Sequence, residues 1–183
     1  MSKFEEKCIK KETIFEGKII KVERDTVILP DGKKAIREVV RHPGAVGIVA
    51  LIDNMILMVR QYRYALAKET IEIPAGKIDQ NEKPISCAIR ELREETGYQG
   101  KMTFLGSFNT SPGFADEVIY LYLAHDLIWS PLATDEDEFL GVVKLPWNDA
   151  VEMAITGQIQ DAKSSLGILL ANRFLNSSQI FAK

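Results

Sequence analysis

A single stretch of helical periodicity, at residues 84–96, interrupts a chain whose preceding part has the pattern of β-strands. Apolar side chains recur there at the spacing of one helix face: Ile85, Ala88, Ile89 and Leu92. Pro84 suits the first helical position, and Gly97 suits the cap that ends a helix. Because a helix with one apolar face must pack on a neighbouring layer, the flanking strands are expected to supply that layer.

The predicted strands lie on both sides of this helix. Before it they cover residues 13–22, 26–29, 35–40, 46–52 and 55–62. After it the pattern predicts strands at 102–108, 118–124 and 140–145, and further helices at 147–156 and 163–175. This order predicts an α+β fold in which a mixed β-sheet is sandwiched between helices.

Charge and composition argue against several classes of protein. The 183 residues carry 23 Lys and Arg against 26 Asp and Glu, and this net charge of −3 argues against general binding to nucleic-acid phosphates. An apolar stretch such as 45–52 is far shorter than the roughly 20 residues that cross a membrane. The first residues lack the apolar core of a targeting leader, and Cys8 and Cys87 form no metal or disulfide pattern. We therefore expect a cytoplasmic protein that binds neither nucleic acid nor membrane.

On the predicted helix, three acidic side chains share the flank beside the apolar stripe: Glu91, Glu94 and Glu95. A helical wheel turns Arg90 and Arg93 to the other flank. Glu91 and Glu95 are one turn apart, and such a like-charge pair destabilises an isolated helix. An ordinary charged face, with an ion pair between Arg90 and Glu94, is the alternative interpretation. Clustered oxygen donors beside a buried stripe favour a site for Mg²⁺ or Mn²⁺.

Gly76 is followed after five residues by Glu82, and after seven more by Arg90-Glu91-Leu92-Arg93-Glu94-Glu95-Thr96-Gly97-Tyr98. This spacing resembles the Nudix box at every fixed position. Tyr98 departs mildly, because a small aliphatic residue is commoner in that slot. The chain is thus similar to Nudix hydrolases, and this resemblance implies the Nudix fold with an N-terminal antiparallel strand region.

The resemblance implies hydrolysis of a nucleoside diphosphate linked to another moiety, with water attacking a phosphorus atom. Since both the pyrophosphate and this protein are negatively charged, divalent cations are needed to neutralise the phosphates. By the same resemblance, Mg²⁺, or alternatively Mn²⁺, is held by the three helix acids and the backbone carbonyl of Ala75. Glu95 and Arg90 are implied to be essential for catalysis. Arg90 would keep the helix and the preceding loop in register, and Glu82 would be an outer acid.

A second motif indicates which Nudix hydrolases the chain resembles. Ser111-Pro112-Gly113, downstream of the box, is similar to the marker of bacterial ADP-ribose pyrophosphatases. Gly113 is therefore expected at the substrate. The likeness extends from about Thr13 to Leu175, nearly the whole chain. Other nucleoside diphosphate sugar hydrolases share the proline, so they remain the alternative.

The acidic run at residues 135–138 falls where this subfamily has a mobile catalytic loop. Glu136 matches the proposed general base, which would take a proton from the attacking water. Glu138 matches a further acid associated with the metal. A solvated loop is the alternative, because four consecutive acids are usually exposed.

Further substrate contacts are implied outside the box. Arg63 is a candidate phosphate clamp, since a guanidinium fits phosphate oxygens bidentately. Phe15 and Arg37 match positions that sandwich the adenine, one of them supplied by a partner subunit. Surface or packing roles are the alternatives for these side chains. Residues 1–43 resemble the family's exchanged dimerisation region and precede a Nudix domain at 44–183, so a homodimer is expected.

The expected activity is a Mg²⁺-dependent ADP-ribose pyrophosphatase that releases AMP and ribose 5-phosphate. The nearest alternative is the same chemistry on another nucleoside diphosphate sugar. A different class is a non-catalytic Nudix domain that senses ADP-ribose and regulates a partner. That class predicts a broken metal helix, whereas all three acids of the helix are present.

Overall fold

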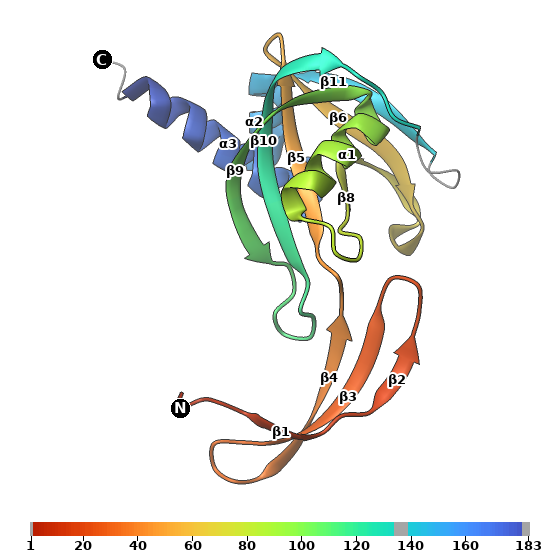
Figure 1. Cartoon of the computed structure of the whole chain (residues 1–183). Helices are drawn as coiled ribbons and strands as arrows, with labels where there is room; N and C mark the ends of the chain where they lie inside the picture. The colour runs from red at the N-terminus through yellow and green to blue at the C-terminus, as the bar shows by residue number, and fades with distance from the viewer. Residues whose placement is uncertain (1, 134–138, 181–183) are drawn as a thin grey trace. The chain divides into compact units, whose positions relative to one another are not determined.

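The computed structural model describes residues 2–133 and 139–180, and the chain divides into two compact units (Figure 1). The smaller unit contains the chain up to Gly44 together with Phe108–Val118. The larger unit contains Ala45–Ser107 and the chain from Ile119 onward. The loop that carries the Ser-Pro-Gly motif therefore belongs to the smaller unit, and the Nudix-box helix belongs to the larger one.

A mixed sheet forms the centre of the larger unit, with seven strands among the described residues. Its order is β11 (Leu140–Pro146), β6 (Met55–Arg63), β5 (Ala45–Ile52), β10 (Val118–Trp129) and β9 (Tyr98–Asn109). The short strands β7 (Lys68–Glu72) and β8 (Ala75–Lys77) pair with β6 and β5 respectively. β10 runs parallel to β5, with Leu121 beside Gly47, whereas β6 runs antiparallel to β5.

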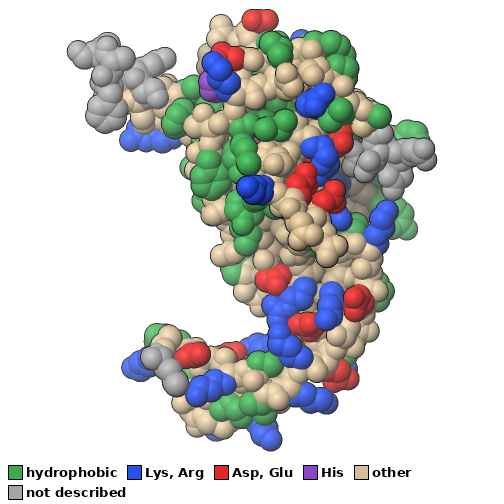
Figure 2. Space-filling view, viewed as in Figure 1, with side chains coloured by type: hydrophobic (Ala, Val, Ile, Leu, Met, Phe, Trp, Pro, Cys, Tyr) green, Lys and Arg blue, Asp and Glu red, His purple; other side chains and the backbone are tan. Residues whose placement is uncertain are grey.

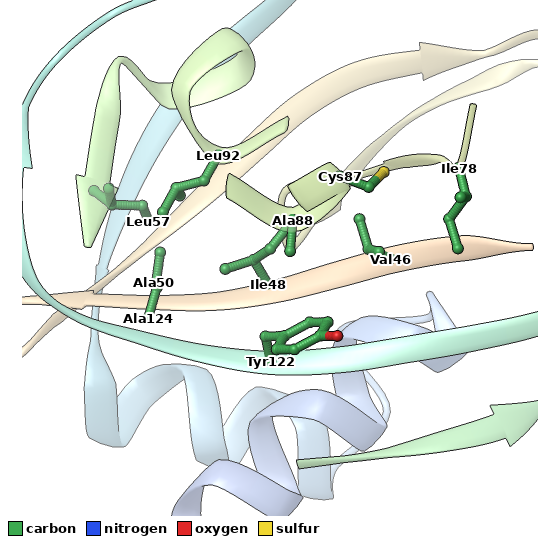
Figure 3. Packing of buried hydrophobic residues seen from close by; sticks show 10 residues of the cluster. All are labelled: Val46, Ile48, Ala50, Leu57, Ile78, Cys87, Ala88, Leu92, Tyr122 and Ala124. Atoms are coloured by element: carbon green, nitrogen blue, oxygen red, sulfur yellow. The ribbon is translucent and has the colours of Figure 1, made fainter. Parts of the chain in front are cut away.

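Helices cover both faces of this sheet. Figure 3 shows α1 (Pro84–Thr96) on one face of β5, with α2 (Trp147–Ile155) and α3 (Ala162–Ile180) on the other. α3 approaches closely because Gly167 has no side chain: a Cβ there would lie 3.1 Å from Val49. The predicted mixed sheet between helices is confirmed.

One cluster of the larger unit's core fills the space between α1 and the sheet (Figure 3). Cys87, Ala88 and Leu92 on α1 pack with residues of the central strands, among them Val46, Ile48, Ala50, Leu57 and Tyr122. These α1 residues recur on one face of the helix. The predicted apolar stripe is only partly confirmed, because Ala88 and Leu92 are buried whereas Ile85 and Ile89 are each 38% exposed. The packing fixes α1, and with it the acidic side chains next to its buried face.

The smaller unit is an antiparallel sheet, four-stranded in the described part of the chain. β3 (Lys21–Ile28) lies between β4 (Lys34–Arg41) on one edge and β1 (Lys7–Lys10) with β2 (Thr13–Glu16) on the other. Its large apolar side chains are mostly exposed, as at Ile9, Ile14, Phe15 and Ile36. The predicted N-terminal antiparallel strand region is confirmed.

Some strand predictions differ from the structure. The strand expected at 13–22 is broken, because a turn closed by the Gly17 N–H donating to the Ile20 carbonyl at 2.9 Å separates β2 from β3. The strand expected at 26–29 is the end of β3, which already begins at Lys21. β1, β7 and β8 were not predicted. Within residues 2–133 and 139–180, no helix is long and apolar enough to cross a membrane.

Candidate active site

Helix α1 buries two acidic side chains next to its apolar face. Glu91 is 7% exposed and Glu95 is 4% exposed. On the face drawn in Figure 2, acidic and basic side chains gather over this helix. An ionised carboxylate withdrawn from water is strongly destabilising unless hydrogen bonds and opposite charges compensate it. The surroundings of these two acids must therefore supply such partners.

Glu95 is held by the strand that precedes the helix in the chain. Its Oε2 accepts a hydrogen bond from the backbone N–H of Ala75 at 2.8 Å. Ala75 opens β8 and lies opposite Gly47 of β5. Two of the residues predicted to hold the metal, Ala75 and Glu95, are thus in direct contact.

Glu91 lies against the backbone of the next residue, the glycine that opens the box. A Cβ placed on Gly76 would lie only 1.9 Å from the carboxylate carbon of Glu91. Any side chain at this position would therefore displace the carboxylate. The glycine is required here by close approach of a helix side chain to the strand backbone.

Arg90 joins α1 to the loop before it. Its Nε and Nη2 each donate to the Glu82 carboxylate at 3.0 Å, and its Nη1 donates to Glu91 at 2.7 Å. The hydrogen bonds from Arg90 lower the pKa of Glu82 to about 2, and those to the carboxylates raise the pKa of Arg90. The side chain thus links the helix acids to Glu82, the first acid of the box.

The predicted orientation of Arg90 on the helix is wrong. Its Nη1 also donates to Glu94 at 2.8 Å, so the guanidinium lies among the acids instead of on the opposite flank. The wheel fixes the direction of the Cβ, but a long side chain reaches its neighbour one turn away. Arg93 does turn elsewhere, and its Nε donates to the Ser130 carbonyl at 2.8 Å. The ion pair of the alternative interpretation is therefore present beside the acidic cluster.

The donor set of α1 fits a hard divalent cation in its chemistry. Glu91 and Glu94 both accept from one guanidinium nitrogen, so a positive charge already lies between their oxygens. In this arrangement no three acidic, histidine or cysteine side chains of the described chain converge as a ready cation site. The Glu91 and Glu94 carboxylates are hydrogen-bonded to Arg90. If Arg90 moved away, their oxygens would be available as ligands of the kind that Mg²⁺ and Mn²⁺ prefer.

Arg63 ends β6 and is fixed by an acid that the sequence analysis missed. Its Nε and Nη2 donate to the buried Glu72 at 2.8 and 2.6 Å, and these bonds raise the pKa of Arg63. Both residues line a cavity of about 460 Å³. A signal for Glu72 was available, because an isolated Glu between Ile71 and Ile73 in a buried segment implies a charged partner.

Phe15 and Arg37, the predicted adenine contacts, lie in β2 and β4, the strands that flank β3 on its two sides in the smaller unit. Phe15 is 54% exposed, and Arg37 binds Glu6 through Nε at 2.8 Å. Within one chain, therefore, neighbouring strands do not bring the two residues together as a pair. Stacking on one adenine would require a second subunit, and this part of the site stays a prediction.

Gly113 lies exposed in the loop of the smaller unit. Just after Gly113 the loop is bonded to β4, because the Val40 N–H donates to the Phe114 carbonyl at 2.8 Å. Arg41, which the sequence analysis did not single out, donates to Asp116 at 3.1 Å and to the buried Glu23 at 2.9 Å. Glu136 and Glu138 lie outside the described residues.

The contact between Gly76 and Glu91 predicts a variant that separates cation binding from folding. Gly76→Ala should displace the Glu91 carboxylate and weaken Mn²⁺ binding by about tenfold or more, as loss of an orienting contact typically does. The chain should still fold, since the displaced atoms end a flexible side chain.

Mn²⁺ titration followed by electron paramagnetic resonance, with thermal unfolding in parallel, measures both effects. Gly141→Ala is the matched control, because a Cβ there meets nothing within 4 Å. Unchanged Mn²⁺ affinity in Gly76→Ala would contradict a cation site at Glu91.

Comparisons with known proteins agree with this geometry. The NUDIX domain family matches residues 41–166, and the nucleoside diphosphate sugar hydrolase N-terminal domain matches residues 6–40. The chain is 47% identical to a methanol dehydrogenase activator of Bacillus methanolicus, over 90% of this chain and 91% of that protein. It is 44% identical to an ADP-ribose pyrophosphatase of Bacillus subtilis, over 92% and 93% of the two chains.

The fold has a close relative among solved structures. A crystal structure of an ADP compounds hydrolase superposes with a TM-score of 0.85, covering 95% of this chain and 96% of that one at 23% identity. The family match spans the mixed sheet and the acidic helix together with the strand backbone that its carboxylates contact. The chain belongs to the Nudix family.

Proposed function

We propose that this protein hydrolyses the pyrophosphate bond of ADP-ribose. A water oxygen attacks one phosphorus atom, the bond from that phosphorus to the bridging oxygen breaks, and the bridging oxygen leaves with the other phosphate. The water gives up a proton, and the products are AMP and ribose 5-phosphate. The chemistry needs no covalent enzyme intermediate.

One observation carries this proposal: two buried carboxylates on α1 lie against the backbone of the preceding strand. Glu95 accepts from the Ala75 N–H, and Glu91 fits only because residue 76 is glycine. This arrangement lies within the NUDIX domain match of a chain that is 44% identical to an ADP-ribose pyrophosphatase. Such buried acids are unfavourable for stability alone, which supports a role in binding cations.

A divalent metal is typical of the family, and we propose Mg²⁺, with Mn²⁺ as the alternative. Bound metal would neutralise phosphate charge and lower the pKa of the attacking water. The groups proposed to hold it are the Ala75 carbonyl and the carboxylates of Glu91, Glu94, Glu95 and Glu138. Arg90, which now binds three acids of the box, would balance their charge whenever no metal does.

The remaining roles are assigned to side chains outside α1. Arg63, held in a fixed plane by Glu72, would bind a substrate phosphate. Glu136 would accept the proton of the attacking water. Gly113, exposed in its loop, would let the substrate approach the backbone closely.

We also propose that the protein is a cytoplasmic homodimer built through residues 1–43, ahead of a Nudix domain at 44–183. The sheet of the smaller unit leaves large apolar side chains exposed, which favours burial against a second copy. Phe15 and Arg37 lie on opposite edges of β3, so one of each from two subunits could enclose an adenine.

Two alternatives follow from the relatives. Another nucleoside diphosphate sugar could be the substrate, because the N-terminal match is to hydrolases of that general class. The 47% identity to a methanol dehydrogenase activator favours, as a second candidate function, activation of an alcohol dehydrogenase. A sensor without catalysis is disfavoured, since Glu91, Glu94 and Glu95 are all present.

The substrate proposal predicts the outcome of a hydrolysis panel at saturating Mg²⁺. ADP-ribose should be converted to AMP faster than ADP-glucose, GDP-mannose, NADH or dATP. Glu95→Gln should lower kcat at least about a hundredfold while the fold persists, because a bound metal supplies several kcal/mol of transition-state stabilisation.

Product analysis by chromatography, with circular dichroism of the variant, checks both statements. Faster turnover of another nucleotide sugar would contradict the substrate assignment but keep the chemistry. Wild-type turnover by Glu95→Gln would contradict the metal assignment. If only a dehydrogenase responds to the protein and no nucleotide is cleaved, the activator function replaces the hydrolase.

The general base is tested separately. Glu136→Gln should lower kcat by about 10²–10³ with little change in KM, since a general base contributes to the transition state and not to ground-state binding. Asp135→Asn is the matched control, because it removes the same charge from the same acidic run. Steady-state kinetics in which both variants lose activity equally would place the base elsewhere.

A further inference from the structure

The first turn of α3 is bonded to the strand segment that precedes the Nudix box. Asp161 accepts from the Ser164 backbone N–H at 3.0 Å and from the Ser164 hydroxyl, so it caps the helix. The Ser164 Oγ accepts in turn from the backbone N–H of Ile73 at 2.8 Å. Although α3 lies about ninety residues further along the chain, its N-terminus therefore contacts the backbone next to Glu72.

Lys163 lies in this first turn, where a positive charge is unfavourable for the helix. The N-terminus of a helix carries partial positive charge and disfavours a lysine. Lys163 is nevertheless mostly buried, with 16% of its side chain exposed. Its Nζ donates to Glu72 and, at 2.9 Å, to Asp161. The contacts with Glu72 and Asp161 therefore offset the unfavourable interaction of this lysine with the helix N-terminus.

The Glu72 carboxylate accepts from two cations and a hydroxyl. Oε1 accepts from the Arg63 Nε at 2.8 Å and from the Thr70 hydroxyl at 2.6 Å. Oε2 accepts from the Arg63 Nη2 at 2.6 Å and from the Lys163 ammonium. Each oxygen thus accepts two hydrogen bonds, which is its full capacity, so the plane of the carboxylate is fixed.

Charge in this cluster is shared between the two cations. Burial raises the pKa of Glu72, but hydrogen bonds and charge from Arg63 and Lys163 outweigh it and lower the pKa to about 2. Lys163 is also paired with Asp161, so the four side chains carry two positive and two negative charges. Because Oε2 of Glu72 accepts from both cations, Arg63 does not hold this carboxylate alone.

The guanidinium of Arg63 is held on one side and open on the other. Its Nε and Nη2 are bound to Glu72, whereas no described group accepts a hydrogen bond from Nη1. Its side chain is 41% exposed and lines the cavity of about 460 Å³ together with Lys163. A fixed guanidinium edge that faces accessible space is the geometry for holding a phosphate oxygen.

We propose that Lys163 is a positioning residue: through Glu72 it fixes the plane of Arg63 and leaves that side chain able to bind a substrate phosphate. This inference rests on the proposed function, because Arg63 is assigned there to the phosphate. Without Lys163, Arg63 would be the one cation bound to Glu72, and the carboxylate would neutralise its charge. Oε2 would no longer be fixed by a second donor, so the plane of the guanidinium could rotate with it. The first turn of α3 thereby becomes part of the phosphate site.

The test compares Lys163→Met with Lys163→Arg in steady-state hydrolysis of ADP-ribose. Lys163→Met should raise KM about tenfold with a smaller change in kcat, which corresponds to about 1.4 kcal/mol of binding. Lys163→Arg, which keeps a cation, should remain within about threefold of the wild type. A purely structural defect would instead lower kcat through the active fraction and leave KM unchanged, and this result would overturn the proposal.

Lys68→Met is the matched control. Lys68 lines the same cavity, but its Nζ donates to the Gln160 side chain at 2.5 Å and not to Glu72. Its removal should change KM less than about twofold, in keeping with the small effect of exposed charges. An equal rise in KM for Lys68→Met and Lys163→Met would show a general loss of positive charge, and would overturn positioning through Glu72.

A double-mutant cycle tests whether Lys163 acts through Arg63. In an Arg63→Ala background, Lys163→Met should cause little further loss, because the side chain that it positions is gone. Full additivity of the two losses would overturn the proposal. If Lys163→Met does not fold, as judged by thermal unfolding, the same cycle with Lys163→Gln decides it.

Binding of inorganic pyrophosphate by calorimetry separates this inference from the proposed function. If the wild type cleaves no nucleotide sugar, the proposed function is refuted, but the positioning role of Lys163 is still open to test. The inference is then supported if Arg63→Ala and Lys163→Met weaken pyrophosphate binding alike while Lys68→Met does not. It is overturned if Lys163→Met binds pyrophosphate like the wild type.

Discussion

The hydrogen bond from the Ala75 N–H to the Glu95 carboxylate joins the strand before the Nudix box to the helix inside it. An ionised group buried on α1 costs several kcal/mol without partners. The strand segment at residues 73–75 must therefore stay beside the helix. It is also held from the other side: the Pro74 carbonyl accepts from the Ile48 N–H, and the Ile73 N–H donates to Ser164, each at 2.8 Å. The segment is thereby fixed to α1, β5 and α3 at once.

Two arginines balance the acids on either side of this segment. Arg90 binds Glu82, Glu91 and Glu94, whereas Arg63 binds Glu72. The pKa of both Glu82 and Glu72 lies at about 2, so both acids remain ionised at neutral pH. Since these pKa values are depressed in the folded state, the pairs stabilise the fold above the ordinary carboxylate pKa, and the contribution is lost as the pH falls toward 2. In a chain of net charge −3, such pairing keeps a dense group of carboxylates folded.

Local patterns in the sequence predicted the parts of this structure that depend on local spacing. The helix bounds 84–96 and the Gly97 cap were predicted from periodicity and cap residues, and both agree with α1. The three-residue strand β8 was missed because it carries no alternation. Lys163 was missed because its partner Glu72 lies 91 residues away, and no local rule connects them. Arg90 was misplaced because a wheel describes Cβ directions, while its contacts depend on the reach of a long side chain.

Anomalous diffraction from crystals grown with Mn²⁺ and a non-hydrolysable ADP-ribose analogue would test the central assignment most directly. A Mn²⁺ peak should lie bonded to carboxylate oxygens of Glu91 and Glu95, at about the 2.0–2.3 Å expected for hard cations with oxygen ligands. Arg90 should then have released at least one of the acids that it now binds. A peak remote from α1, with Glu91 and Glu94 still bound to Arg90, would contradict a cation site on this helix.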